Sequence, residues 1–445
     1  MKKTYLAACT AALLALGTGW AQASPVDNPD DPAYVVKTVQ ADNTKARSEA
    51  PKQAELAQAA SKVTLPTQMV DRHAIPEAQS LYRYLAVLPE TGRVLYGHQN
   101  DAHHKMFRIQ SGTESDTKDM TGSLSGIVGV DALSLTGDEL HPREAAKVPG
   151  DTLMDKLTNL SVKAVDEGAI LTLSMHMPNF AVVAKKPKVN GHYDFQGYTA
   201  GTTTGDVVKR ILPGGDLAPV FTDYLDMVAD YALRLQAKNI PVIFRPLHEH
   251  NGSWFWWGGK NTNDENFTAL WQFTVKYLRD TKGVHNFIYA YSPNGPFDSG
   301  ASYLDRYPGD RYVDILGVDS YQDNRDDAYF SKLQQTLDVM HEVAKQNHKV
   351  VALTEVGVRD GGGLALQHNA DKDWFTHVMQ LCLKNKVPYF LTWANFEKEA
   401  HNFFEPYMTS DTKGHEMVDN FVRFYNEPAS TFADGTGDYR HIFSK

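Results

Sequence analysis

Two glutamates in this 445-residue chain stand at the ends of short apolar runs that have the composition of buried strands. Glu249 follows the apolar residues 241–244, and Glu355 ends the apolar run that starts at Val350. A carboxyl group at a strand end can serve as an acid, a base or a nucleophile if a cleft exposes it. Hydrolysis of a glycosidic bond uses two such groups, one on each side of the bond. The pair therefore predicts sugar-cleaving chemistry.

Indole side chains crowd around the first of these glutamates. Trp254, Trp256 and Trp257 follow Glu249 on the same segment. Aromatic side chains stack on the apolar faces of sugar rings, and an apolar wall raises the pKa of a carboxyl group by disfavouring its charged form. Three neighbouring indoles cannot all face one cleft, so we expect one or two of them to pack beneath the loop.

Both glutamates belong to a series of apolar runs of strand length. These runs occupy residues 94–99, 126–135, 169–176, 241–249, 286–293, 313–321, 350–357 and 388–395. Amphipathic helical patterns separate them, as in residues 221–235, where apolar side chains recur at helical spacing opposite aspartates. Buried strands that alternate with helices predict a single α/β domain, a (β/α)8 TIM barrel with long loops on its catalytic face.

Polar and aromatic residues fall at the carboxyl ends of these runs, where such a barrel carries its chemistry. They are His98, Asp131, His176, Glu249, Ser292, Asp319, Tyr321, Glu355 and Trp393. A closed barrel brings Glu249 and Glu355 to one rim, where carboxyl groups about 5 to 5.5 Å apart give retention and about 6.5 to 9.5 Å apart give inversion. The sequence leaves this separation open. Tyr321, on the strand before that of Glu355, is placed to donate a hydrogen bond to it.

The first 23 residues have the pattern of a secretory signal peptide, with two lysines, an apolar stretch and Ala21-Gln-Ala23 before Ser24. We therefore expect a secreted or periplasmic protein that starts near Ser24 after processing. Leu6-Ala-Ala-Cys9 resembles a lipoprotein cleavage box. The apolar stretch before it is too short, which argues against a lipid anchor.

The remaining chain divides into two parts. Residues 24–68 show weak periodicity and predict an N-terminal linker or extension, whereas residues 69–445 form the predicted barrel domain. The formal net charge of −10 and the lack of a long basic cluster argue against a nucleic-acid partner. After the signal, no apolar run approaches the length of a membrane span. We expect a monomer.

Three motifs resemble those of glycoside hydrolase family 26. They are Arg245-Pro-Leu-His-Glu-His-Asn-Gly-Ser-Trp-Phe-Trp-Trp-Gly, Thr354-Glu-Val-Gly and Tyr307-Pro-Gly-Asp-Arg-Tyr-Val-Asp-Ile-Leu-Gly-Val-Asp-Ser-Tyr321. The similarity runs from about Gly97 to Trp393. The resemblance implies a retaining β-mannanase that cleaves β-1,4-mannosidic bonds in mannan, glucomannan or galactomannan by double displacement. Its partner would then be a β-mannan polysaccharide or manno-oligosaccharides.

The resemblance also implies roles for individual residues. Glu249, which ends the fourth strand, takes the role of the acid/base, and Glu355, which ends the seventh, takes that of the nucleophile. His248 takes the place of the family's partner before the acid/base. Trp393 takes that of the aromatic floor under the sugar. His250 departs from the family pattern.

Position alone adds His176, Trp254 and Tyr321 to the candidate substrate-binding residues, together with His248 and Trp393. Each has a structural alternative. His176 at the end of the third strand could donate to a backbone carbonyl, and Trp393 could be a core indole. The sequence does not decide between these alternatives.

Other functions use the same fold. A related enzyme could act on another β-glycan, such as xylan or mixed-linkage glucan. A metal-dependent barrel hydrolase would use a His-x-His pair such as His248 and His250, but it needs a further histidine and an aspartate from later strands. Residues 289–293 and 392–395 contain neither, so we expect no metal ion and no other cofactor. Cleavage within the polymer and at its end both stay open.

Overall fold

Eight parallel strands close into a barrel in the computed structural model, which describes residues 33–44, 50–64, 68–201, 205–346, 348–397 and 402–443. The strands are β2 (Val94–Gln99), β3 (Ile127–Asp131), β4 (Ile170–Ser174), β5 (Val242–Arg245), β6 (Phe287–Tyr291), β7 (Ile315–Asp323), β8 (Val350–Arg359) and β9 (Tyr389–Thr392). Each pairs with the next, and β2 also pairs with β9, which closes the sheet. The predicted (β/α)8 barrel is confirmed.

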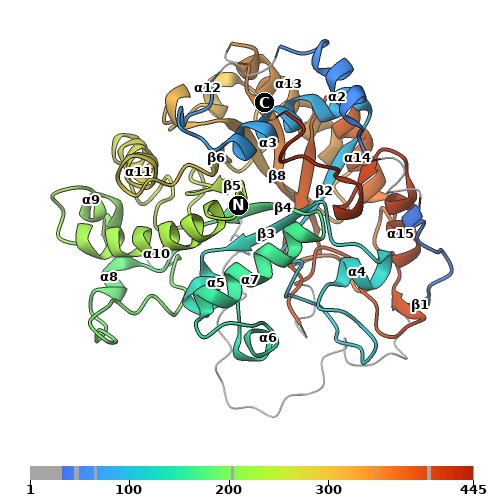
Figure 1. The fold of residues 1–445 in the computed structure, drawn as a ribbon, viewed down its shortest axis with the longest axis horizontal. Helices are drawn as coiled ribbons and strands as arrows, with labels where there is room; N and C mark the ends of the chain where they lie inside the picture. Colours follow the sequence, from blue (N-terminus) through green and yellow to red (C-terminus); the bar gives the residue numbers. More distant parts are fainter. Residues whose placement is uncertain are drawn as a thin grey trace, which may run out of the picture.

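Helices surround this barrel (Figure 1). They are α2 (Gln53–Ala60), α3 (Pro76–Val87), α4 (Asp116–Thr121), α5 (Leu133–Thr136), α6 (Pro142–Ala146), α7 (Leu153–Asp166), α8 (Phe180–Val183), α9 (Val207–Ile211), α10 (Ala218–Gln236), α11 (Asp264–Lys276), α12 (Gly300–Tyr303), α13 (Tyr329–Lys345), α14 (Trp374–Lys384) and α15 (Val418–Asn426). No helix in the described part of the chain is long and apolar enough to cross a membrane. The predicted signal peptide, residues 1–23, lies outside the described residues.

Strand alternation divides the apolar side chains between two cores. Ile127, Ile170, Ile243, Ile288 and Ile315 belong to one buried cluster with side chains of α3, which covers the amino end of the barrel. The alternate positions face the surrounding helices and join a second, larger cluster. Because neighbouring side chains on a strand point to opposite faces, the same parity sets which polar residues enter the barrel mouth.

Two strands end four residues earlier than the sequence indicates. The run predicted over 126–135 leaves the sheet after Asp131, because Leu133 starts α5. The run predicted over 241–249 leaves it after Arg245. Pro246 follows and has no N–H to continue the ladder. Glu249 therefore lies on a loop rather than on a strand.

The N-terminal extension packs against the barrel wherever it is described. β1 (Tyr34–Val36) pairs antiparallel with β10 (Lys413–His415), and in Figure 1 it lies beside α15. The Asp419 carboxylate at the start of α15 accepts from the backbone N–H groups of Thr38 and Val39 at 2.8 and 2.9 Å. Packing therefore begins before residue 69, the predicted start of the barrel domain.

Asp419→Ala should release this segment. The variant loses two backbone hydrogen bonds and the Thr38 hydroxyl contact, so we expect the free energy of unfolding to fall by about 1–2 kcal/mol. Equilibrium unfolding in urea measures the loss, and hydrogen exchange should show faster exchange at Thr38 and Val39. Unchanged exchange at both amides would contradict this docking.

Candidate active site

A buried arginine joins two acidic residues at the carboxyl ends of three strands. Arg245 of β5 donates from Nη1 to Asp319 of β7 at 2.7 Å and from Nη2 to Glu355 of β8 at 2.6 Å. Burial opposes the charge on Arg245, but Asp319 and Glu355 outweigh it and raise the pKa of the guanidinium. Burial raises the pKa of Asp319, and Arg245 opposes that shift with help from the Thr354 hydroxyl. Arg245 thus fixes both carboxyl groups in the barrel mouth.

The second oxygen of Glu355 also receives a donor. The Tyr321 hydroxyl, two residues beyond Asp319 on β7, donates to Glu355 Oε1. Burial, reinforced by the charge of Glu355, raises the pKa of Tyr321, so the phenol keeps its proton and stays a donor. Both oxygens of Glu355 are therefore held in place by hydrogen bonds. This is the arrangement of a carboxylate that must remain ionised and oriented.

Glu249 reaches the same mouth from a strained loop. Leu247 and Glu249 both have left-handed backbone conformations, with φ of 52° and 50°. Such conformations cost side-chain-bearing residues about 1–3 kcal/mol each and persist where the surroundings enforce them. Here the Glu249 N–H donates to the Ser292 carbonyl at 2.8 Å. The loop is thus anchored to the end of β6.

The environment of Glu249 favours its neutral form. Burial, followed by the negative charge of Glu355, raises the pKa of Glu249 to about 7, although the Trp254 indole, Arg245 and Arg359 act against this. Trp254 Nε1 donates to Glu249 Oε2 at 2.7 Å. The two glutamates therefore differ in their surroundings: those of Glu249 favour a proton that it can give, whereas Glu355 is bound by two hydrogen-bond donors.

Two histidines form a chain next to Glu249. His176, beyond β4, contacts Asp131 of β3 through Nδ1 at 2.7 Å, and its Nε2 lies 3.1 Å from His248 Nε2. Burial opposes a charge on His176, but Asp131 raises its pKa, whereas burial and the neighbouring His176 lower the pKa of His248. This difference favours His176 as the donor and His248 as the acceptor between the two Nε2 atoms. Strands β3, β4 and β5 are linked through this chain to the residue before Glu249.

The aromatic residues separate into exposed and buried groups. Trp254 and Trp393 are half-buried, and the Trp393 ring lies 5.2 Å from that of His176. Trp256 and Trp257 are completely enclosed, and Trp257 Nε1 donates to the His248 carbonyl at 3.0 Å. Two of the three clustered indoles therefore pack beneath the loop, as expected. Trp254 and Trp393 keep surface that a sugar can contact.

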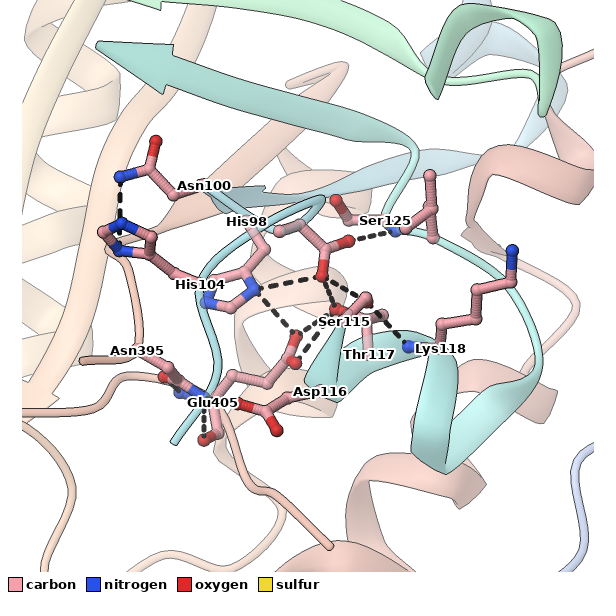
Figure 2. A network of polar contacts seen from close by, with 12 residues as sticks. His98, Asn100, His104, Ser115, Asp116, Thr117, Lys118, Ser125, Asn395 and Glu405 are labelled. Atoms are coloured by element: carbon pink, nitrogen blue, oxygen red, sulfur yellow. Dashed lines mark hydrogen bonds and ion pairs between the residues drawn. The ribbon is translucent and has the colours of Figure 1, made fainter. Parts of the chain in front are cut away.

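His98 does not join this site, contrary to its predicted place at the same rim. It faces outward from β2 toward α4, and its Nδ1 lies 3.5 Å from Asp101 and 3.6 Å from Glu405 (Figure 2). Ligand atoms of these three residues lie within 4.8 Å of one another, the one such group among the described residues that could hold a metal ion. Hydroxyl groups of Ser115 and Thr117 already bond to the Asp101 carboxylate. The group lies behind the barrel wall, where it cannot contact a bond held between Glu249 and Glu355.

His250 and His104 also make contacts other than with the two glutamates. His250 stacks on Phe267 with ring centres 4.5 Å apart, which places it in the helix layer. His104 Nε2 bonds to the Glu139 carbonyl at 2.7 Å. The His-x-His pair therefore splits, since His248 faces His176 and His250 faces the opposite way. The geometry does not favour the metal-dependent alternative.

Sequence reasoning missed three charged residues of the mouth. Arg245, which entered the sequence analysis only as the first residue of a motif, binds Glu355 and Asp319. Alternate side chains of β5 point into the barrel, and counting along the strand could have shown that Arg245 is one of them. Arg359 lies beyond the predicted end of its strand. Glu139 lies on a loop with no pattern, where burial and then Asp131 raise its pKa to about 8.

Two neighbouring carboxyl groups in different environments at the carboxyl end of a (β/α)8 barrel are the arrangement of barrel glycoside hydrolases. Residues 70–405 match the family model for glycosyl hydrolase family 26, and the chain belongs to that family. The resemblance of the three motifs is thereby confirmed.

Curated relatives carry the name mannan endo-1,4-beta-mannosidase. The chain is 33% identical to one from Bifidobacterium adolescentis, an alignment that covers 82% of this chain and 37% of that relative. It is 29% identical to one from Bacillus subtilis strain 168, which covers 75% of this chain and 83% of that relative. The chain thus spans little more than a third of the Bifidobacterium relative.

Solved structures agree with the sequence relatives. The catalytic domain of the GH26 endo-beta-1,4-mannanase of Bacillus sp. JAMB-750 superimposes with a TM-score of 0.72 at 35% identity, covering 84% of this chain and 96% of that one. A double mutant of the Cellulomonas fimi endo-beta-1,4-mannanase gives a TM-score of 0.71 at 32% identity, covering 84% and 79%. Both similarities extend over the whole barrel.

Arg245→Met should leave Glu355 and Asp319 without their shared cation. We expect the free energy of unfolding to fall by about 3–5 kcal/mol at pH 7, because two buried carboxyl groups lose their partner. Unpaired carboxyl groups have raised pKa values in the folded state, so protonation relieves the loss and the deficit should shrink as the pH falls.

Denaturant titrations at pH 7 and pH 5 test this prediction. Arg325→Met, at an exposed arginine on the turn after β7, serves as the control and should change stability by less than about 0.5 kcal/mol. A deficit that is the same at both pH values would show that Arg245 stabilises the fold by packing alone.

Proposed function

We propose that this chain is a retaining glycoside hydrolase that cleaves β-1,4-mannosidic bonds in mannans. The observation that carries this proposal is the contrast between the two glutamates: Glu249 has a pKa near 7, and Glu355 is bound by Arg245 and Tyr321. Mannan as substrate is supported by the names of the relatives that match most of this chain. The proposed partners are β-mannan and manno-oligosaccharides, with no cofactor.

The first half of the reaction uses Glu355 as the nucleophile. Its ionised oxygen attacks the anomeric carbon, while Glu249 gives its proton to the glycosidic oxygen, and the bond to the departing sugar breaks. The product is a covalent glycosyl-enzyme with Glu355 as an ester. Arg245 and Tyr321 orient the attacking group throughout this step.

The second half returns Glu249 to its starting state. Formation of the ester removes the negative charge of Glu355, which contributes to the raised pKa of Glu249. That pKa then falls, so the Glu249 carboxylate can take a proton from the incoming water. The water attacks the anomeric carbon and releases Glu355. One electrostatic coupling thus serves both the acid and the base role.

Four other residues contact the sugar or position the two glutamates in this proposal. Trp393 supplies a stacking surface, and His176, in contact with it, donates toward the sugar or orients His248. Trp254 positions Glu249 through its indole N–H. Tyr321 orients the nucleophile.

Export completes the proposal. The signal pattern of residues 1–23 supports a secreted or periplasmic enzyme without a lipid anchor, which suits a polysaccharide substrate too large to enter a cell. The acidic net charge of −10 supports the absence of nucleic-acid binding. A monomeric state stays a prediction.

Alanine variants should separate the two glutamates by role. Glu249→Ala should hydrolyse an aryl β-mannoside with a good leaving group far better than mannan, because that aglycone departs without a proton. Azide should then accelerate release and give a β-mannosyl azide. Glu355→Ala should be nearly inactive on both substrates and give, at most, the α-azide.

NMR and thin-layer chromatography identify the products of each variant. The parent enzyme is compared on mannan, xylan and mixed-linkage glucan by the same methods. Excess EDTA should leave activity on mannan unchanged. Near-normal activity of either variant on mannan would contradict the two-carboxylate mechanism, and preferred cleavage of xylan or glucan would contradict the substrate.

The acid role of Glu249 also predicts a pH dependence. The value of kcat/KM on mannan should decline as the pH rises through about 7, because Glu249 must hold its proton in the free enzyme. His176 titrates as well, so the matched measurement is Glu249→Ala with the aryl mannoside. This variant should lose the alkaline decline. Persistence of the decline would assign it to His176 instead.

A further inference from the structure

Arg359 lies on the same face of β8 as Glu355. Side chains of a strand alternate, so positions 355, 357 and 359 point the same way. The register pairs Tyr321 with Gly357 and Asp323 with Arg359. Arg359 therefore stands two pleats nearer the mouth than Glu355. The strand predicted to end at residue 357 extends just far enough to place it there.

Tyr321 supports the Arg359 side chain. A Cβ atom at Gly357 would lie 2.8 Å from the Phe404 ring and 3.0 Å from the Tyr321 ring, so the missing side chain leaves room for both. The Arg359 guanidinium carbon lies 4.5 Å from the centre of the Tyr321 ring. A cation over an aromatic ring at this distance is attracted to it. Glu355, Tyr321 and Arg359 thus form one continuous wall.

The guanidinium of Arg359 has no acceptor within the described part of the chain. Its Nε is enclosed and lacks a hydrogen-bond partner there, although the side chain as a whole is half-buried. By contrast, Arg245 is fully paired. A covered donor without a partner costs about 1–3 kcal/mol. A ligand with hydroxyl groups at the mouth would satisfy it.

The charge of Arg359 acts on Glu249. Among the groups that shift the pKa of Glu249, burial and Glu355 raise it, whereas Trp254, Arg245 and Arg359 lower it. Arg359, two pleats beyond Glu355 on the same face of β8, is therefore near enough to Glu249 to influence its charge. Glu249 gives its proton to the glycosidic oxygen, so the departing sugar lies beside it. Trp393 and His176 contact each other and, under the proposed function, serve the sugar that Glu355 attacks.

We propose that Arg359 is a substrate-contacting residue that donates hydrogen bonds to hydroxyl groups of the departing sugar, held in position by stacking on Tyr321. This inference rests on the proposed function and assigns a determinant to its leaving-group side. The planar fork of a guanidinium suits two neighbouring ring hydroxyls, as it suits the two oxygens of a carboxylate.

Two substrates, each assayed with the full-length protein, test this role. In mannotetraose the departing group is a sugar, and in an aryl β-mannobioside it is an aromatic ring. Arg359→Gln should lower kcat/KM for mannotetraose about 10- to 100-fold, since hydrogen bonds to a charged group are lost. The value for the aryl substrate should stay within about threefold. Thermal unfolding of the variant should match that of the parent enzyme.

The pH profile gives a second readout. Arg359→Gln removes a charge that lowers the pKa of Glu249, so the alkaline decline of kcat/KM should move to higher pH. Arg359→Lys keeps the charge and should keep the parent profile, while it still loses activity on mannotetraose because its ammonium has no planar fork. Arg325→Gln, on the exposed turn after β7, is the matched control and should change neither quantity.

Two results would overturn the role proposed for Arg359, and a third would overturn the proposed function. Equal losses on both substrates would place Arg359 in fold support rather than in contact with the departing sugar. Full activity of Arg359→Gln on mannotetraose would remove it from the binding site. A parent enzyme that cleaves neither substrate would overturn the proposed function itself, which is a separate and recognisable outcome.

Discussion

Three carboxyl groups of the barrel mouth, those of Glu249, Asp319 and Glu355, surround one fully paired cation. Arg245 contacts Asp319 and Glu355 directly and lies near enough to Glu249 to lower its pKa. Buried carboxyl groups this close together cannot all stay negatively charged. Protons and hydrogen-bond donors are therefore distributed unequally among them. Glu355 receives two donors, whereas Glu249 receives one indole N–H. This division gives two chemically identical side chains different hydrogen bonding and different electrostatic surroundings.

The strained loop after β5 serves the same constraint. Left-handed conformations at Leu247 and Glu249 turn the chain sharply after Pro246 stops the strand. The buried Trp257 holds the loop by its bond to the His248 carbonyl. The strain is thus offset by packing outside the cleft. Reaction geometry in this protein depends on side chains that a substrate never touches.

Much of this arrangement follows from the sequence, and the exceptions have physical reasons. Runs of β-branched residues fix the strands, and their ends locate Glu355 and Tyr321. The orientation of His98 was open to prediction, because alternation along β2 makes it face α4 while Gln99 faces inward. The prediction placed His98 at the rim because it treated every polar residue at a strand end as facing the barrel mouth, and this was wrong.

Other features had no local signal. The path of the loop that carries Glu249 depends on Ser292 and on indoles that pack only in the folded barrel. Glu139 enters the mouth from a loop, where Asn100 holds it at 2.7 Å. The pairing of Arg245 depends on which inward residues of β7 and β8 lie within reach. Such contacts arise from barrel closure and cannot be inferred from one segment.

Closure of the sheet by β2 and β9 sets the order in which the chain can become stable. Tyr96 and Thr392, 296 positions apart, meet through their hydroxyl groups, and β1 pairs with β10 later still. A nascent chain therefore holds its first strands without their final neighbours until the last strand has been made. The other strands of the barrel pair with their neighbours in sequence, so the closing pair of β2 and β9 is the step that must wait. A contact this distant in sequence forms slowly and prolongs exposure of unpaired strand edges. Until β9 pairs with β2, the edges of the growing sheet stay open to pairing with another chain, which is the consequence of closing the barrel last.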